Sequence, residues 1–191
     1  MRAKVYINQQ TLAGYLWEDE ERIAMEDFCQ LTERLTERKY NGSHEQIAKT
    51  IRKFARNPLI EVVHFYELVL ACYLMGNSDM HLKNFSLIKR EKGYFMAPAY
   101  DVIASRLYIP DDREELALTI NGKKNKLIRN DFEQAMRAGG LPVPAISNLF
   151  HRIYQGVKKW PNIIQESFLS PVWKNKLLSQ IEQTVRIMFE N

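Results

Sequence analysis

Cysteine is scarce in this sequence of 191 residues, which contains only Cys29 and Cys72. The two are not arranged in a C-x-x-C motif, so neither a disulfide framework nor a cysteine-based zinc site is indicated. Both fall within apolar helical patterns. We therefore expect two buried thiols and a protein of the reducing cytoplasm.

Long apolar runs, low-complexity segments and internal repeats are also missing. The sequence has no run of 18 apolar residues and no basic-then-apolar leader, which predicts a cytoplasmic protein with no membrane partner. The net charge is +4, and basic residues are mixed with acidic ones. The densest basic cluster contains Lys123, Lys124 and Lys126. It could meet phosphate or an acidic surface, but a solvated turn is the favoured interpretation, and nothing beyond charge indicates nucleic-acid binding.

The composition that remains is that of a globular domain with its own core. Hydrophobic residues make up 46% of the chain and charged residues 26%, both average values. A chain of this length buries roughly 70% of its unfolded surface in one domain. We divide it into an N-terminal β-hairpin with a charged break (1–22) and a helical lobe (23–191).

The pattern of apolar residues predicts a mainly α fold with a small β-hairpin, an α+β class. Residues 4–17 read as a β-hairpin, WEDEER as a charged break, and the apolar spacing from Met25 to Leu35 as a helix over 25–37. Further elements follow. They are a helix opened by a Ser43–Gln46 capping box, a helix over 58–75 that is apolar nearly all round, a hairpin of 85–88 with 94–97, a helix capped by Asn130 and Glu133, a helix over 144–157 and a last helix opened by Ser170-Pro171.

The stretch GNSDMHLKNFSLI (76–88) concentrates polar groups between the apolar helix and the second hairpin. Asp79 and Asn84 lie at one end of that hairpin, and Asp101 follows its second strand, so the three side chains are expected to converge. Phosphoryl transfer to a hydroxyl needs a carboxylate that accepts a proton and oxygen ligands that hold Mg²⁺ against nucleotide phosphates. The D-x-x-x-x-N spacing from Asp79 to Asn84 fits that chemistry, and Lys83 would neutralise phosphate charge.

Each of these residues also has a structural interpretation. Asn77-Ser78-Asp79 would form an Asx turn that ends the helix. His81 reads more readily as a hydrogen-bonded structural histidine than as a base. Lys83 alone is more often a solvated charge. The joint order of apolar helix, loop, hairpin and second aspartate favours the catalytic interpretation.

At these residues the chain resembles the HipA-like serine/threonine kinases of type II toxin–antitoxin systems, in their C-terminal lobe. Four blocks occur in the family's order over about residues 24–190: MEDFCQLTERLTERKY (25–40), GNSDMHLKNFSLI (76–88), APAYD (97–101) and ELALTINGKKNKL (115–127). The resemblance implies a protein-kinase-like C-lobe that uses ATP and Mg²⁺. It also implies these roles: Asp79 as catalytic base, Asn84 and Asp101 as Mg²⁺ ligands, and His81, Lys83 and Tyr100 near the nucleotide.

The sequence departs from the kinase pattern in one respect, because its eight glycines form no G-x-G-x-x-G loop. The first hairpin resembles the opening of the family's N-terminal region, as in a member with an internal deletion or in a split system with a separate N-lobe chain. We therefore expect the isolated chain to be inactive. The alternative is a pseudokinase-like module that binds an antitoxin or regulator; a metal-dependent hydrolase ranks third. As partners, the resemblance implies a DNA-binding antitoxin and, as substrate, an aminoacyl-tRNA synthetase.

Overall fold

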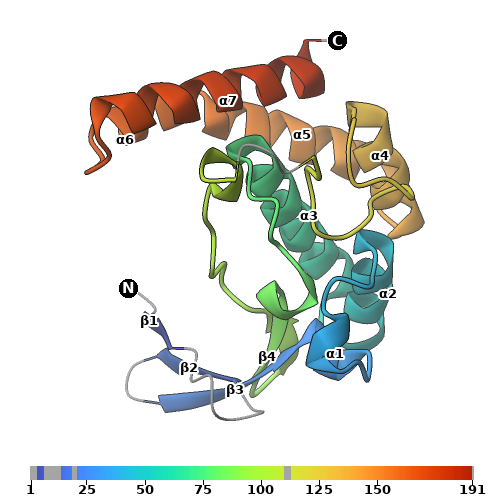
Figure 1. Ribbon diagram of the computed structural model, residues 1–191. Coiled ribbons are helices and arrows are strands. Elements are labelled where there is room, and N and C mark those ends of the chain that lie inside the picture. Colours follow the sequence, from blue (N-terminus) through green and yellow to red (C-terminus); the bar gives the residue numbers. More distant parts are fainter. Residues whose placement is uncertain (1–3, 7–13, 19–20, 110–112, 191) are drawn as a thin grey trace.

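A central helix, α3 (Pro58–Met75), organises the structure (Figure 1). The computed structural model describes residues 4–6, 14–18, 21–109 and 113–190. Helix α3 begins with proline at its first position and ends at Gly76, whose φ of 75° gives a left-handed cap. Its side chains fill the main core, including the fully buried Phe65, Leu70 and Leu74. The expected helix over 58–75 is confirmed at both ends.

By length and composition, α3 is also apolar enough to cross a membrane. The helix contains Glu61, His64 and Glu67, so it is not an uninterrupted run of 18 apolar residues. Half of the apolar window is buried inside the fold, where α3 packs against α2, α5 and α7. A core helix passes the same test, so the finding is weak evidence for a membrane segment.

Helices α2 (His44–Phe54), α5 (Val143–Val157) and α7 (Pro171–Phe189) pack on α3. Helices α4 (Arg129–Ala138) and α6 (Trp160–Gln165) pack on these helices in turn. Ser43 caps α2 as expected, because its Oγ accepts the Gln46 N–H at 3.2 Å. The cap predicted for α4 is wrong. The Asp131 carboxylate accepts the Ile128 N–H at 3.1 Å, and Asn130 and Glu133 do not cap the helix. The short helix α6 was not predicted.

The strands form one antiparallel sheet in sequence order. They are β1 (Lys4–Tyr6), β2 (Gly14–Glu18), β3 (Glu21–Asp27), β4 (Ser86–Arg90) and β5 (Gly93–Met96). The two expected hairpins are present, although residues 7–13 of the first lie outside the described residues. Strand β3 joins them by pairing with β2 and with β4, where Met25 faces Ile88. It crosses the expected boundary between residues 22 and 23, and that division stays a prediction.

The predicted helix over 25–37 is wrong. Asp27 starts α1 (Phe28–Leu31) with a capping box, in which Asp27 accepts the Gln30 N–H at 2.9 Å and Gln30 accepts the Asp27 N–H at 3.0 Å. The helix is short because Glu33 adopts a left-handed φ of 54°. Residues before Asp27 instead pair with β4. A helical apolar pattern was therefore overridden by strand pairing with a distant segment.

Candidate active site

The loop that carries the candidate site starts where α3 ends, and α7 holds that end in place. Thr184 donates its hydroxyl to the Leu74 carbonyl at 2.9 Å, and the Gln180 amide donates to the Met75 carbonyl at 2.6 Å. These carbonyls lie in the last turn of α3, where intrahelical donors are lacking. The site loop therefore leaves a fixed helix end, which is a rigid mount for its side chains.

Asn77 links the two halves of the site. Its Oδ1 accepts the Asp79 N–H at 3.2 Å, which confirms the predicted Asx turn. Its Nδ2 points to the Asp101 carbonyl at 3.4 Å. Ser78 and Ser105 add a second link, because the Ser105 Oγ accepts the Ser78 N–H at 2.9 Å. One buried asparagine therefore forms hydrogen bonds with the backbone of both Asp79 and Asp101.

Asn84 and Asp101 make direct contact. The Asn84 Nδ2 donates to the Asp101 Oδ2 at 2.5 Å, and the Asn84 Oδ1 accepts the His81 N–H at 3.0 Å. Asn84 is buried, whereas Asp101 is exposed and has a left-handed φ of 53°. Such a backbone conformation is uncommon outside glycine and occurs often at functional sites. The expected convergence is therefore observed for Asn84 and Asp101, whereas Asp79 is linked to Asp101 only through Asn77.

Asp79 is exposed, and its carboxylate has one partner from elsewhere in the chain. The Tyr40 hydroxyl donates to Asp79 Oδ1 at 2.9 Å across 39 residues of sequence. Tyr40 belongs to the block 25–40, but no local pattern marks a side chain that meets the site from so far away. It is a site residue that sequence reasoning missed.

His81 and Lys83 lie beside these groups in different environments. His81 is buried, and its Nδ1 has no hydrogen-bond partner within the described residues. Its interpretation as a hydrogen-bonded structural histidine stays a prediction. Burial, and then the Lys39 charge, lower the pKa of His81, which keeps the ring neutral at pH 7. Lys83 is half-buried. Burial raises the pKa of the Cys29 thiol in α1, and the positive charge of Lys83 partly opposes that rise.

Tyr100 is buried and connects the segment before Asp101 to the site loop and to β4. Its hydroxyl donates to the Lys83 carbonyl at 2.8 Å and lies 2.5 Å from Ser86 Oγ. Its ring packs with Met25 and Ile88 on the face of the sheet opposite the main core. Burial raises the pKa of Tyr100, so the hydroxyl stays protonated. This arrangement fixes the segment before Asp101 against β4, and a role near the nucleotide stays a prediction.

Two lysines of the 123–126 cluster form ion pairs within the fold. Lys123 pairs with the buried Asp131 at 2.8 Å, and Lys124 pairs with Glu114 at 3.1 Å. The turn interpretation fits these contacts better than a phosphate site does. The predicted free thiols are confirmed, since both Cys29 and Cys72 are buried and unpaired.

The donor set at the site fits Mg²⁺ better than a transition metal. Among the described residues, no group of three or more His, Cys, Asp or Glu side chains could hold a metal ion. Asp101 offers an exposed carboxylate, and the Asn84 amide oxygen keeps a lone pair beyond its bond to His81. One carboxylate, one amide oxygen and substrate phosphates form the kind of site in which Mg²⁺ is commonly held.

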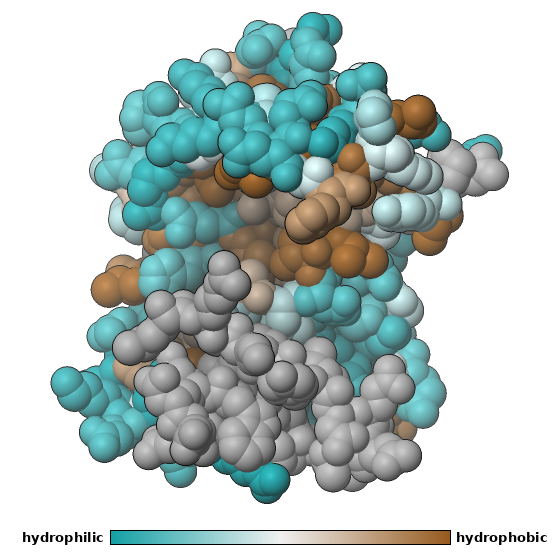
Figure 2. All heavy atoms as spheres, turned by 90° about the vertical axis from the view of Figure 1, so that its left-hand side faces the viewer, coloured by the Kyte–Doolittle hydropathy of each residue, from teal (hydrophilic) through white to brown (hydrophobic). Residues whose placement is uncertain are grey.

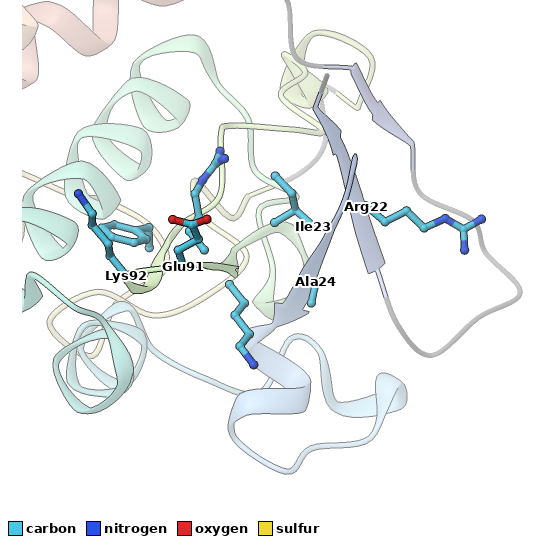
Figure 3. A pocket seen from close by; sticks show the side chains of 8 residues that line it. Arg22, Ile23, Ala24, Glu91 and Lys92 are labelled. Atoms are coloured by element: carbon cyan, nitrogen blue, oxygen red, sulfur yellow. The ribbon is translucent and has the colours of Figure 1, made fainter. Parts of the chain in front are cut away.

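A cavity of about 720 Å³ lies elsewhere on the sheet, between β3 and the β4–β5 turn. In Figure 3, Ile23 and Arg22 point to opposite sides of β3, and Glu91 and Lys92 lie across the space from Ile23. Strand β4 separates this turn from the site loop by about 13 Å, at about 3.3 Å per residue. The rim of the cavity carries basic side chains from Arg22, Lys89, Arg90 and Lys92, together with Glu91. We assign no ligand to it.

An apolar band crosses the face seen in Figure 2. In the segment that follows Asp101, Val102, Ile103 and Ile109 are exposed, and Tyr108 stacks on Trp173 of α7 with ring centroids 4.9 Å apart. Single exposed apolar residues are ordinary, but a contiguous group often marks an interaction surface. This group begins at the residue next to Asp101.

Comparison with known proteins identifies the family. The model of the HipA-like C-terminal domain matches residues 9–160. The chain belongs to this family. The Sinorhizobium fredii protein named "Putative kinase Y4mE" is 32% identical over 131 residues, which is 64% of this chain and 31% of that protein. A Haemophilus influenzae protein with the same kind of name is 31% identical over 145 residues, 66% of this chain and 42% of the relative.

Solved structures share the fold of this HipA-like domain. HipA of Shewanella oneidensis MR-1, in a complex with HipB and operator DNA, aligns with a TM-score of 0.68 at 20% identity, over 95% of this chain and 51% of HipA. The Helicobacter pylori proinflammatory kinase CtkA aligns with a TM-score of 0.57 at 16% identity, over 90% of this chain and 70% of CtkA. The expected mainly helical, HipA-type fold is confirmed. The chain spans only about a third to two-fifths of its curated relatives and about half of HipA.

Proposed function

We propose that this HipA-like domain is the catalytic C-lobe of a serine/threonine protein kinase that transfers the γ-phosphoryl group of ATP to a protein hydroxyl. The observation that carries the proposal is the hydrogen-bonded pair of Asn84 and Asp101, which Asn77 joins to Asp79. These contacts link the Asp79 carboxylate, which would accept the hydroxyl proton, to the Asp101 carboxylate and the Asn84 amide, which would hold Mg²⁺ against the phosphates. A structural loop has no need of two exposed aspartates in this arrangement.

In the proposed reaction, Asp79 accepts the proton of the substrate hydroxyl. As the hydroxyl oxygen bonds to the γ-phosphorus, the bond to the β-phosphate oxygen breaks and ADP leaves. Asn84 and Asp101 would hold Mg²⁺, which neutralises charge on the phosphates. Lys83 and the neutral His81 lie on the same loop, and their predicted positions near the nucleotide are part of the proposal. Tyr100 fixes the segment that leads to Asp101.

The acceptor is proposed to be a polypeptide. The exposed Val102, Ile103 and Ile109 lie directly after Asp101, where an extended chain would place a serine or threonine within reach of Asp79. Following the resemblance, an aminoacyl-tRNA synthetase is a proposed substrate and a DNA-binding antitoxin a proposed partner, with a cytoplasmic location. The Shewanella HipA forms a complex with HipB and DNA, which supports the antitoxin proposal.

A second candidate is a pseudokinase-like module that binds a regulator without transfer. The sequence feature that favours it is the lack of a G-x-G-x-x-G loop, because a kinase needs a loop that covers the phosphates. Under the first proposal this cover comes from a separate N-lobe chain. Under the second it is not needed.

Calorimetry with Mg·ATP separates the two candidates. We expect the wild-type chain and Asp79→Ala to bind nucleotide and Asp101→Ala to lose binding, because Asp101 and not Asp79 would hold the metal. Glu91→Ala, which removes an exposed carboxylate at the β4–β5 turn, serves as the matched control and should bind normally. No binding by the wild type at millimolar nucleotide would favour the binding module. In a separate assay of phosphoryl transfer from ATP, transfer that persists in Asp79→Ala would refute the role of Asp79 as the base.

A further inference from the structure

The contact between Tyr40 and Asp79 has no part in the chemistry so far described. The phenol oxygen lies 2.9 Å from Asp79 Oδ1, although the two residues come from different elements. Asp79 is exposed, and an exposed aspartate ordinarily exchanges among several rotamers of its side-chain bonds. A donor on one carboxylate oxygen restricts that rotation.

Tyr40 is itself held on several sides, so it can act as a support. Its backbone neighbour Lys39 accepts the Leu82 N–H at 3.1 Å, which fastens this segment to the site loop. The Tyr40 ring meets the edge of the His81 ring, with centroids 5.1 Å apart. The Lys39 ammonium lies 4.9 Å from the centroid of the Tyr40 ring. The phenol therefore approaches Asp79 from a fixed direction.

The contact leaves the other carboxylate oxygen open. Oδ1 accepts from Tyr40, and within the described part of the chain no donor reaches Asp79 Oδ2. Burial raises the pKa of Tyr40, as do the hydrogen bond and the charge of Asp79, so at neutral pH the hydroxyl keeps its proton and donates it. A proton acceptor works best when its orientation is set before the substrate arrives.

We propose that Tyr40 is a positioning residue, which fixes Asp79 through Oδ1 so that Oδ2 faces the hydroxyl of the substrate. This inference rests on the proposed function, because Asp79 is taken as the base. Tyr40 touches neither the nucleotide nor the acceptor in this scheme and acts only through Asp79. Removal of its hydroxyl should therefore slow proton acceptance and leave nucleotide binding unchanged.

The first test measures the contact without any need for activity. Chains labelled with ¹³C at tyrosine Cζ are titrated by NMR, and Tyr40→Phe assigns the signal. In Asp79→Asn the pKa of Tyr40 should fall, because the carboxylate charge is gone. In Tyr40→Phe the Asp79 side chain should change from one χ1 rotamer to an average of several, as read from three-bond couplings. An unchanged Tyr40 titration or an unchanged Asp79 rotamer would overturn the proposal.

The second test measures transfer from γ-labelled ATP with an N-lobe chain supplied in trans, because the isolated chain is expected to be inactive. Tyr40→Phe keeps the ring on His81 and should lower kcat about tenfold or more, with the KM for ATP unchanged. Tyr154→Phe is the matched control, since Tyr154 lies on α5 with its ring 4.9 Å from that of Phe189, away from the site, and it should keep wild-type kcat. Full kcat in Tyr40→Phe would overturn the positioning role. A wild type without transfer would count against the proposed function, and the NMR result would still decide whether Tyr40 positions Asp79.

Discussion

We predict that His44 makes the stability of the fold fall as the pH is lowered below about 6.5. His44 is fully buried at the start of α2, between Phe65 and Phe85, with its Nδ1 3.0 Å from the Thr119 carbonyl. Its Nε2 has no partner among the described residues. Burial lowers the pKa of His44 from 6.5 to about 4. The folded protein therefore keeps the ring neutral in a range where the unfolded chain protonates it.

The sign and size follow from linkage. Between pH 6.5 and 4 the unfolded state binds one more proton than the folded state, so acid favours unfolding. The two pKa values differ by about 2.5, and one pKa unit corresponds to about 1.36 kcal/mol. The full loss is about 3.4 kcal/mol, of which about 2 kcal/mol is already lost at pH 5. This is a large part of the 5–15 kcal/mol that typically stabilises a domain.

The assay is urea denaturation followed by circular dichroism at several pH values between 7 and 4.5. His44→Asn does not titrate, and its amide can still donate to Thr119. The difference in unfolding free energy between wild type and variant removes the contribution of all other groups. It should change by about 1.2 kcal/mol per pH unit between pH 6 and pH 4.5. A difference that is constant over this range would refute the reasoning.

Two further predictions concern groups that frame the site. Gly76 and Gly122 both have positive φ, but a Cβ on Gly76 would lie 1.6 Å from Gln180 Nε2, whereas a Cβ on Gly122 would meet nothing within 4 Å. Gly122→Ala should lower the free energy of unfolding by about 1 kcal/mol through backbone strain alone, and Gly76→Ala should lower it further because of the clash with Gln180. Thermal unfolding measures both losses. Equal losses would show that α7 does not constrain the end of α3. Tyr100→Phe leaves the Lys83 carbonyl without its donor and the Ser86 hydroxyl without its acceptor, and it should lower the free energy of unfolding by about 1–3 kcal/mol in chemical denaturation. A neutral result would mean that the hydroxyl is not bonded as described.

The elements that the sequence predicted well are those fixed by local signals. Helix α3 was predicted at both ends, because its apolar residues, its first proline and Gly76 lie within the helix or next to it. The second hairpin and the Asx turn at Asn77 were predicted for the same reason. The spacing from Asp79 to Asn84 is local too. The hairpin then places Asp101 beside Asn84, so the contact between these two residues could be predicted.

Tertiary structure alone decided what depends on distant partners. Residues 25–27 have a helical apolar pattern, but Met25 pairs with Ile88 and extends a sheet, because cross-strand packing outweighs weak local propensity. Tyr40 reaches Asp79 only after the chain has folded around α3. Sequence by itself therefore determined the HipA-like pattern, the central helix and the acidic groups of the site. The orientation of those groups was set by hydrogen bonds between segments that are far apart in the chain, which no local pattern encodes.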